Sequence, residues 1–69
     1  METKQALAAN IRALMGRKDL KKSDLMTAAG VSAQTVTAWT SGKAMPGPDK
    51  LEKIAAFLGV TVGELFDGK

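Results

Sequence analysis

The 69-residue sequence contains no cysteine and no histidine. The lack of cysteine excludes disulfide bonds and thiolate metal ligands, and the lack of histidine removes the commonest general base. Together the two absences remove most zinc and haem ligation. No serine or threonine stands beside an activating base, and no glycine-rich phosphate-binding loop is present. We therefore expect no catalytic residue, no bound metal and no cofactor.

Long apolar runs are also missing, since no stretch comes near the roughly 18 consecutive apolar residues of a membrane-spanning helix. The N-terminal sequence METKQALAANIRALMG has no continuous apolar core, so we expect no signal peptide. Because 45% of the residues are hydrophobic, the chain is expected to fold rather than to stay disordered. Its length indicates one domain, residues 1–69, near the lower size limit for a single core.

Charge is distributed unevenly along the chain. Residues 1–43 contain seven basic and three acidic side chains, a net charge of +4, whereas residues 44–69 contain three and four, a net charge of −1. A polyanion would therefore approach the N-terminal part. The alternative is ordinary solvation of lysine-rich helix surfaces, and charge alone does not separate the two interpretations.

Residues 20–43 predict two short helices joined by a turn. In the first, residues 22–29, Leu25 and Ala29 lie on one buried face because they are one helical turn apart. Gly30 suits the left-handed residue that ends a helix. Two helices joined by a turn of about three or four residues that contains glycine form a helix-turn-helix.

The second helix begins after Ser32, a residue type that favours the N-cap, and ends at Gly42. Val36 and Trp39 form its buried face. The opposite face consists of small or uncharged polar residues: Ala33, Gln34, Thr37, Ala38 and Ser41. A helix in the major groove of DNA needs slim side chains that hydrogen-bond base edges or contact thymine methyl groups. The alternative is a short polar surface helix without a ligand.

Helical spacing predicts three further helices. Residues 3 to about 18 form the first, with Gly16 as an alternative end. We expect its basic side chains Arg12, Arg17 and Lys18 to be solvated, and a phosphate contact by Arg17 or Lys18 is the alternative. A loop over residues 42–48 precedes a helix that runs from Pro48 to Leu58, and we expect Met45 to pack beneath this loop. Residues 61–64 match a capping box that opens a last helix through Phe66.

Residues 10–68 resemble the lambda-repressor-like, Cro-type helix-turn-helix domain of phage repressors and bacterial regulators. The likeness rests on an ordered set of residues: Leu20, Leu25, Gly30, Val31, Ser32, Val36, Trp39, Gly42, Lys43, Pro48, Leu51, Ile54, Ala55, Leu58, Gly59, Val60 and Leu65. The resemblance implies a compact all-α domain of five helices with the helix-turn-helix in the second and third. It also implies that Asp19 takes a left-handed position where the family often has glycine.

The chain departs from the family at the start of the second helix. Lys21 stands at the expected N-cap, where asparagine, serine or threonine would be better, and Ser23 is the alternative cap for a later start. Met26 occupies a position where the family prefers alanine. Methionine fills irregular gaps more readily than other large residues do.

By resemblance, residues 33–40 are the recognition helix that lies in the major groove. Gln34 is the best candidate for reading a base, because glutamine makes two hydrogen bonds to adenine. The expected base contacts are Gln34, Ala33, Thr37 and Ala38, and the expected contacts to the DNA backbone are Lys21, Lys22, Ser32, Thr35 and Lys43. Phe66 is expected either to form a small dimer contact or simply to pack in the core.

The implied partner is double-stranded DNA that carries a near-palindromic operator. We expect a homodimer on DNA and a location in the cytoplasm of a bacterium or phage-infected cell, in association with the nucleoid. If the chain is the N-terminal domain of a longer repressor, we expect a monomer in dilute solution. The alternative function is a protein-interaction module on the same fold, antitoxin-like or anti-repressor-binding, because a fold does not by itself determine a function.

Overall fold

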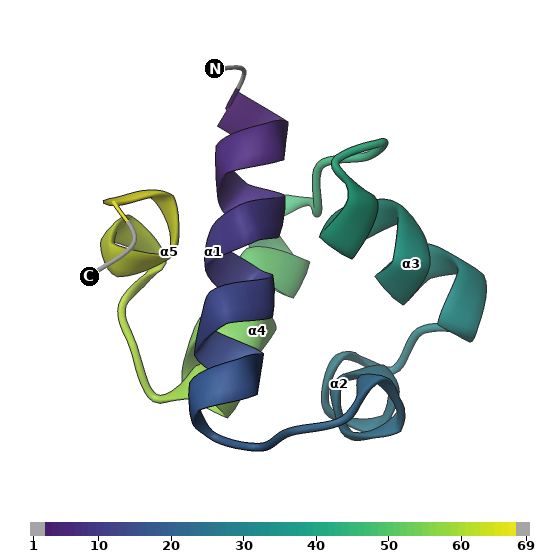
Figure 1. Cartoon of the computed structure of the whole chain (residues 1–69). Coiled ribbons are helices and arrows are strands. Elements are labelled where there is room, and N and C mark those ends of the chain that lie inside the picture. Colours follow the sequence, from purple (N-terminus) through teal and green to yellow (C-terminus); the bar gives the residue numbers. More distant parts are fainter. Residues whose placement is uncertain (1–2, 68–69) are drawn as a thin grey trace.

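A computed structural model describes residues 3–67, which form five α-helices and no β-strand. The helices are α1 (Thr3–Arg17), α2 (Lys22–Ala29), α3 (Ala33–Ser41), α4 (Pro48–Leu58) and α5 (Val62–Asp67). In Figure 1, α1 runs through the middle of the molecule with α5 on one side and α3 on the other. The predicted all-α, five-helix fold is confirmed.

The core forms where α1 meets α3 and α5 and where α2 meets α4. Its apolar side chains recur at helical spacing, so each helix directs one face inward. The largest fully buried side chains come from all five helices: Leu7, Ile11, Leu25, Val36, Ile54, Leu58 and Leu65. Met26, at the position where alanine was expected, is half-buried and packs against this core.

The junction between α1 and α2 follows the prediction closely. Helix α1 passes through Gly16 and ends at Arg17, one residue earlier than expected. Asp19 has a φ of 54° and is the one non-glycine residue with a positive φ among residues 3–67. Lys21 is the N-cap of α2, with φ −104° and ψ 159°, and its backbone N–H donates to Asp24 Oδ2 at 2.9 Å. Since a lysine side chain offers no acceptor to the first turn, Asp24 provides the side-chain half of this cap.

The C-terminal helices begin as their sequence predicts. Helix α4 has the predicted bounds, and α5 extends one residue beyond Phe66. Thr61 and Glu64 form a reciprocal capping box, in which each side chain accepts from the other's backbone N–H at 3.1 Å. Asn10 of α1 fastens the other end of α5, because its side-chain amide donates to the carbonyl of Leu65 at 2.6 Å.

The prediction that Met45 packs beneath the loop before α4 is wrong. Its side chain is 41% exposed, and the next residue, Pro46, is buried instead. Two neighbouring residues of a loop can point to different sides, and here Pro46 rather than Met45 faces the core. The apolar content of the loop indicates that something is buried there but not which residue.

Candidate nucleic-acid interface

The face of α3 opposite its apolar residues is open to solvent. Val36 and Trp39 are only 0% and 4% exposed, so they fix the rotation of the helix about its axis. On the other side Ala33, Gln34 and Thr37 are exposed. Three of the four predicted base-contacting residues therefore lie together on an uncharged outer surface. The fourth, Ala38, is half-buried.

Two of the predicted backbone-contacting residues meet at the N-terminus of α3. Ser32 is the N-cap, and its Oγ accepts from the backbone N–H of Thr35 at 3.3 Å. The hydroxyl oxygens of Ser32 and Thr35 lie 3.1 Å apart, within hydrogen-bond distance of each other. Ser32 is exposed and Thr35 is half-buried. This end of α3 thus offers a hydroxyl and backbone N–H groups, which are groups that bind phosphate.

Lys22, in the first turn of α2, reaches across to α3. Its Nζ donates to Thr37 Oγ1 at 2.5 Å, and both residues are exposed. The structure therefore joins an expected phosphate contact directly to an expected base contact. Sequence reasoning missed this pair because the two residues are 15 positions apart and belong to different helices.

The other two predicted lysines stand at opposite ends of the helix-turn-helix. Lys21 precedes α2, and Lys43 follows α3; both are exposed. The backbone N–H of Lys43 donates to the carbonyl of Ala38 at 3.0 Å, which sets the direction in which the chain leaves α3. Exposed positive charge therefore stands both before α2 and after α3.

Helix α1 holds the C-terminal end of α3. Arg12 is exposed as predicted, but it is not merely solvated, because its Nη1 donates to the carbonyl of Thr40. Beside this contact is an open groove lined by Gln5, Ala8, Ala9, Arg12 and Ser41. Arg12 thus adds to the apolar contacts that orient α3. No local spacing indicates this role, since 28 positions separate the two residues.

Gly42 lets the turn after α3 come close to α1. Its φ is +79°, and a Cβ placed on it would lie 3.2 Å from Gln5 Cγ and 3.4 Å from Gln5 Cα. Glycine is therefore suited to this position both by its conformation and by the lack of space. The close approach positions Lys43, the next residue, relative to α1.

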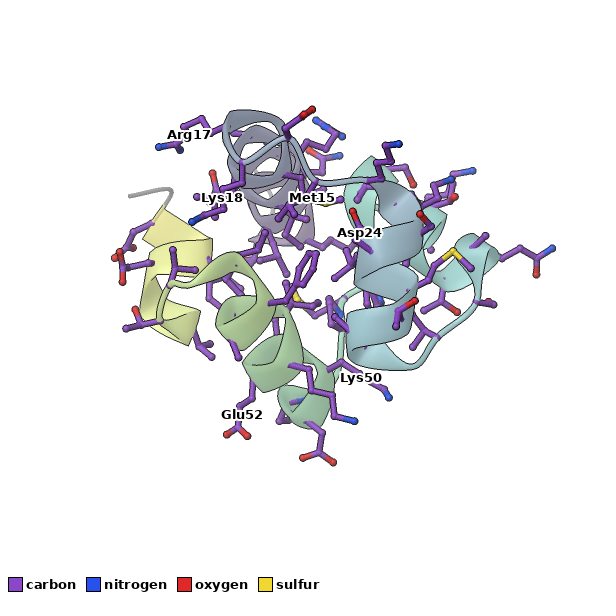
Figure 2. The ribbon with its side chains drawn as sticks, turned by 90° about the horizontal axis from the view of Figure 1, so that it is seen from below. Met15, Arg17, Lys18, Asp24, Lys50 and Glu52 are labelled. Atoms are coloured by element: carbon purple, nitrogen blue, oxygen red, sulfur yellow. The ribbon has the colours of Figure 1, made fainter. Side chains whose placement is uncertain are left out.

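Lys50 of α4 contacts the helix-turn-helix where α2 ends and its turn begins. Its Nζ donates to the carbonyl of Ala29, the last residue of α2, at 3.0 Å. In Figure 2 Lys50 lies at the end of α2 opposite to Asp24. A positive charge is favourable at a helix C-terminus, where unpaired carbonyl groups gather. Because Lys50 and Ala29 are 21 positions apart, no local spacing indicates this contact.

Three further features bear on function: the position of Phe66, the arrangement of the acidic side chains and the length of the helices. Phe66 is half-buried, packs against the core, and its carbonyl accepts from Asn10 Nδ2 at 3.1 Å. Within residues 3–67, no group of three or more acidic side chains is arranged to hold a metal ion. The same residues contain no helix of sufficient length and apolar character to cross a membrane.

Comparison with known proteins places these features in a family. The model of the Cro/C1-type HTH DNA-binding domain matches residues 10–68. The HTH-type transcriptional regulator PrtR of Pseudomonas aeruginosa is 45% identical over 56 residues, which cover 81% of this chain and 22% of that protein. The matched segment is therefore a minor part of that relative. No solved structure matches the chain significantly. The matched residues include α2, α3 and the turn between them, and the chain belongs to the Cro/C1-type helix-turn-helix DNA-binding domain family.

Proposed function

We propose that this chain binds double-stranded DNA sequence-specifically, as the DNA-binding domain of a phage-type transcriptional repressor or regulator. The observation that carries the proposal is the slim, uncharged outer face of α3, which Val36 and Trp39 hold away from the core. A helix with such a face fits the major groove, where side chains reach base edges. The similarity to a protein named as a transcriptional regulator supports the same function.

Base contacts are assigned to the outer face of α3. Gln34 reads a base through its side-chain amide, which can donate and accept at the same time and so matches the edge of adenine. Ala33, Thr37 and Ala38 supply methyl or hydroxyl contacts to neighbouring bases. Because none of these side chains is charged, discrimination depends on hydrogen bonds and methyl contacts rather than on net attraction.

Backbone contacts are assigned to the groups that surround this face. Lys21 and Lys22 stand at the start of α2, and Lys43 follows α3. Ser32 and Thr35 lie at the N-terminus of α3, where backbone N–H groups add to the binding of an anion. These contacts set the orientation of the domain on the duplex and contribute affinity without regard to sequence.

The proposed arrangement on DNA is a homodimer on a near-palindromic operator in the bacterial nucleoid, within the cytoplasm. A single domain of this size covers few base pairs, so two copies about one helical turn apart provide the specificity that one lacks. Phe66, at the half-buried surface of α5, is the proposed dimer contact.

Selection of bound sites from a random pool of double-stranded DNA tests the proposal. We expect an enriched half-site in inverted repeat. We also expect the affinity for it to fall steeply with salt, with each lysine–phosphate contact adding about −0.9 to the slope of log K against log salt concentration. A pool that stays random after repeated rounds would refute sequence-specific binding and favour the protein-interaction alternative.

A further inference from the structure

The hydroxyl of Thr37 is bonded differently from the hydroxyls of two other threonines in the helix-turn-helix. Thr27 Oγ1 donates to the carbonyl of Ser23 at 3.1 Å, and Thr40 Oγ1 donates to the carbonyl of Val36 at 3.0 Å. Both therefore bind back onto their own helix, as threonine commonly does. Thr37 Oγ1 instead accepts from Lys22 Nζ.

The direction of this bond is fixed by chemistry. An ammonium group carries three donors and no acceptor, so Thr37 Oγ1 must accept. A hydroxyl has one proton and two lone pairs, and Lys22 occupies one lone pair. Within residues 3–67, no backbone carbonyl accepts the proton of Thr37, which is consequently available on the exposed face of α3.

The major groove offers both kinds of partner to such a hydroxyl. Guanine presents the acceptors N7 and O6, and thymine presents O4, whereas cytosine presents the donor N4 amino group. The nearby ammonium charge attracts the partly negative acceptor atoms and repels the partly positive amino group. An unpaired hydroxyl proton pressed against an amino group would also lose its bond to water.

We infer that Lys22 is a positioning residue for base readout: by donating to Thr37, it makes the Thr37 hydroxyl a donor that selects guanine or thymine over cytosine at one position of the operator. The inference rests on the proposed function, because it names the base that one residue on the outer face of α3 recognises. Lys22 then has two effects on binding, a general attraction for phosphate and a specific effect on one base pair.

Lys21 provides a matched control for separating these effects. It carries the same charge, adjoins Lys22 in the sequence and is also exposed, and its side chain makes no hydrogen bond within the described part of the chain. Loss of charge at either lysine weakens the attraction for phosphate. Only loss of Lys22 removes the bond to Thr37.

The experiment measures the relative affinity of the full chain for all four base pairs at each position of the selected operator. Thr37→Val removes the hydroxyl with little change in shape and identifies the base pair that Thr37 contacts. We expect preference at that base pair to fall about three- to tenfold, the range of one hydrogen bond. Lys22→Met should flatten the same preference, whereas Lys21→Met should weaken every sequence alike. Lys22→Arg, which keeps a charged donor, should retain the preference.

Modified bases identify the contacted atom. If guanine is preferred, a loss of affinity with 7-deazaguanine, which lacks the N7 acceptor, in the unmodified chain but not in Thr37→Val assigns the contact to N7, and no loss in either assigns it to O6. If thymine is preferred, deoxyuridine should bind as well as thymine, because it keeps O4 and lacks only the methyl group. A loss of affinity with deoxyuridine, with no loss in Thr37→Val, would show a methyl contact and overturn the inference.

Several other outcomes would contradict the role of Lys22 or the proposed function. Preference for cytosine, full discrimination in Lys22→Met, or equal flattening by Lys21→Met would each contradict the role of Lys22. If Thr37→Val changes preference at no position while the unmodified chain still selects a site, the inference fails and the proposed function stands. If the unmodified chain selects no site, the proposed function itself fails. Thermal unfolding of each variant verifies that these exposed substitutions leave the fold intact.

Discussion

Lys50 Nζ of α4 lies 3.0 Å from the carbonyl oxygen of Ala29, the residue at which α2 ends. The contact joins α4 to α2 through two residues that are 21 positions apart in the sequence. It provides a donor for one of the carbonyl groups that a helix leaves unpaired at its C-terminus. The turn of the helix-turn-helix follows directly after Ala29. A side chain outside the DNA-binding motif therefore supports the point at which the chain turns from α2 into α3.

Replacement of Lys50 by methionine should lower the stability of the domain. The variant keeps the apolar stem of the side chain but loses the charged hydrogen bond, so we expect the free energy of unfolding to fall by about 0.5–1.5 kcal/mol. Lys53→Met is the matched control, because Lys53 lies in the same helix and is exposed. Chemical denaturation followed by circular dichroism measures both. Equal stability of the two variants would show that the contact with Ala29 contributes nothing.

Substitutions at Asn10 should separate loss of a hydrogen bond from repulsion. The Asn10 amide donates to the carbonyls of Leu65 and Phe66 at 2.6 and 3.1 Å. Asn10→Ala removes both bonds and should destabilise the domain by about 1–3 kcal/mol, since carbonyls at a half-buried site lose their partner. Asn10→Asp should be worse at neutral pH, because a carboxylate would face two carbonyl oxygens. Thermal melts of the two variants test this order, and a more stable aspartate variant would contradict the donor role.

Two glycines with similar backbone conformations should differ in their tolerance of alanine. Gly30 has a φ of +68° with nothing within 4 Å of an added Cβ, whereas at Gly42 the Cβ would meet Gln5. Gly30→Ala should destabilise by the left-handed penalty alone, roughly 1–2 kcal/mol. Gly42→Ala should lose on the order of 1 kcal/mol more, because α1 and the turn must separate. Denaturation midpoints compare them, and identical losses would mean that Gln5 yields without penalty.

Comparison of sequence and structure shows which features were predictable. The helix bounds and the outward face of α3 follow nearly to the residue from local spacing and end residues. The left-handed Asp19 does not follow from spacing; the family resemblance implies it. The contacts of Lys22, Arg12 and Lys50 with neighbouring helices depend on how those helices pack, and no local pattern encodes them. The prediction for Met45 failed for a related reason, because the path of the loop decides that Pro46 and not Met45 is buried.

Gln34 provides the most direct test of the base contacts assigned to the outer face of α3. Its side chain is exposed in the first turn of α3 and makes no hydrogen bond within residues 3–67, so it is available to a base without losing an internal contact. Gln34→Ala should leave the stability of the domain nearly unchanged, because alanine favours the helix and the substitution exposes no buried side chain. It should lower affinity for the preferred operator by about 1–3 kcal/mol and relax choice at one base pair.

Lys43→Met is the contrasting variant, because loss of a phosphate contact weakens all sequences alike and reduces the salt dependence. Fluorescence anisotropy with the selected operator and single-base variants measures both. A Gln34→Ala variant that keeps the original order of preference at every position would remove Gln34 from the base contacts, whatever its overall affinity.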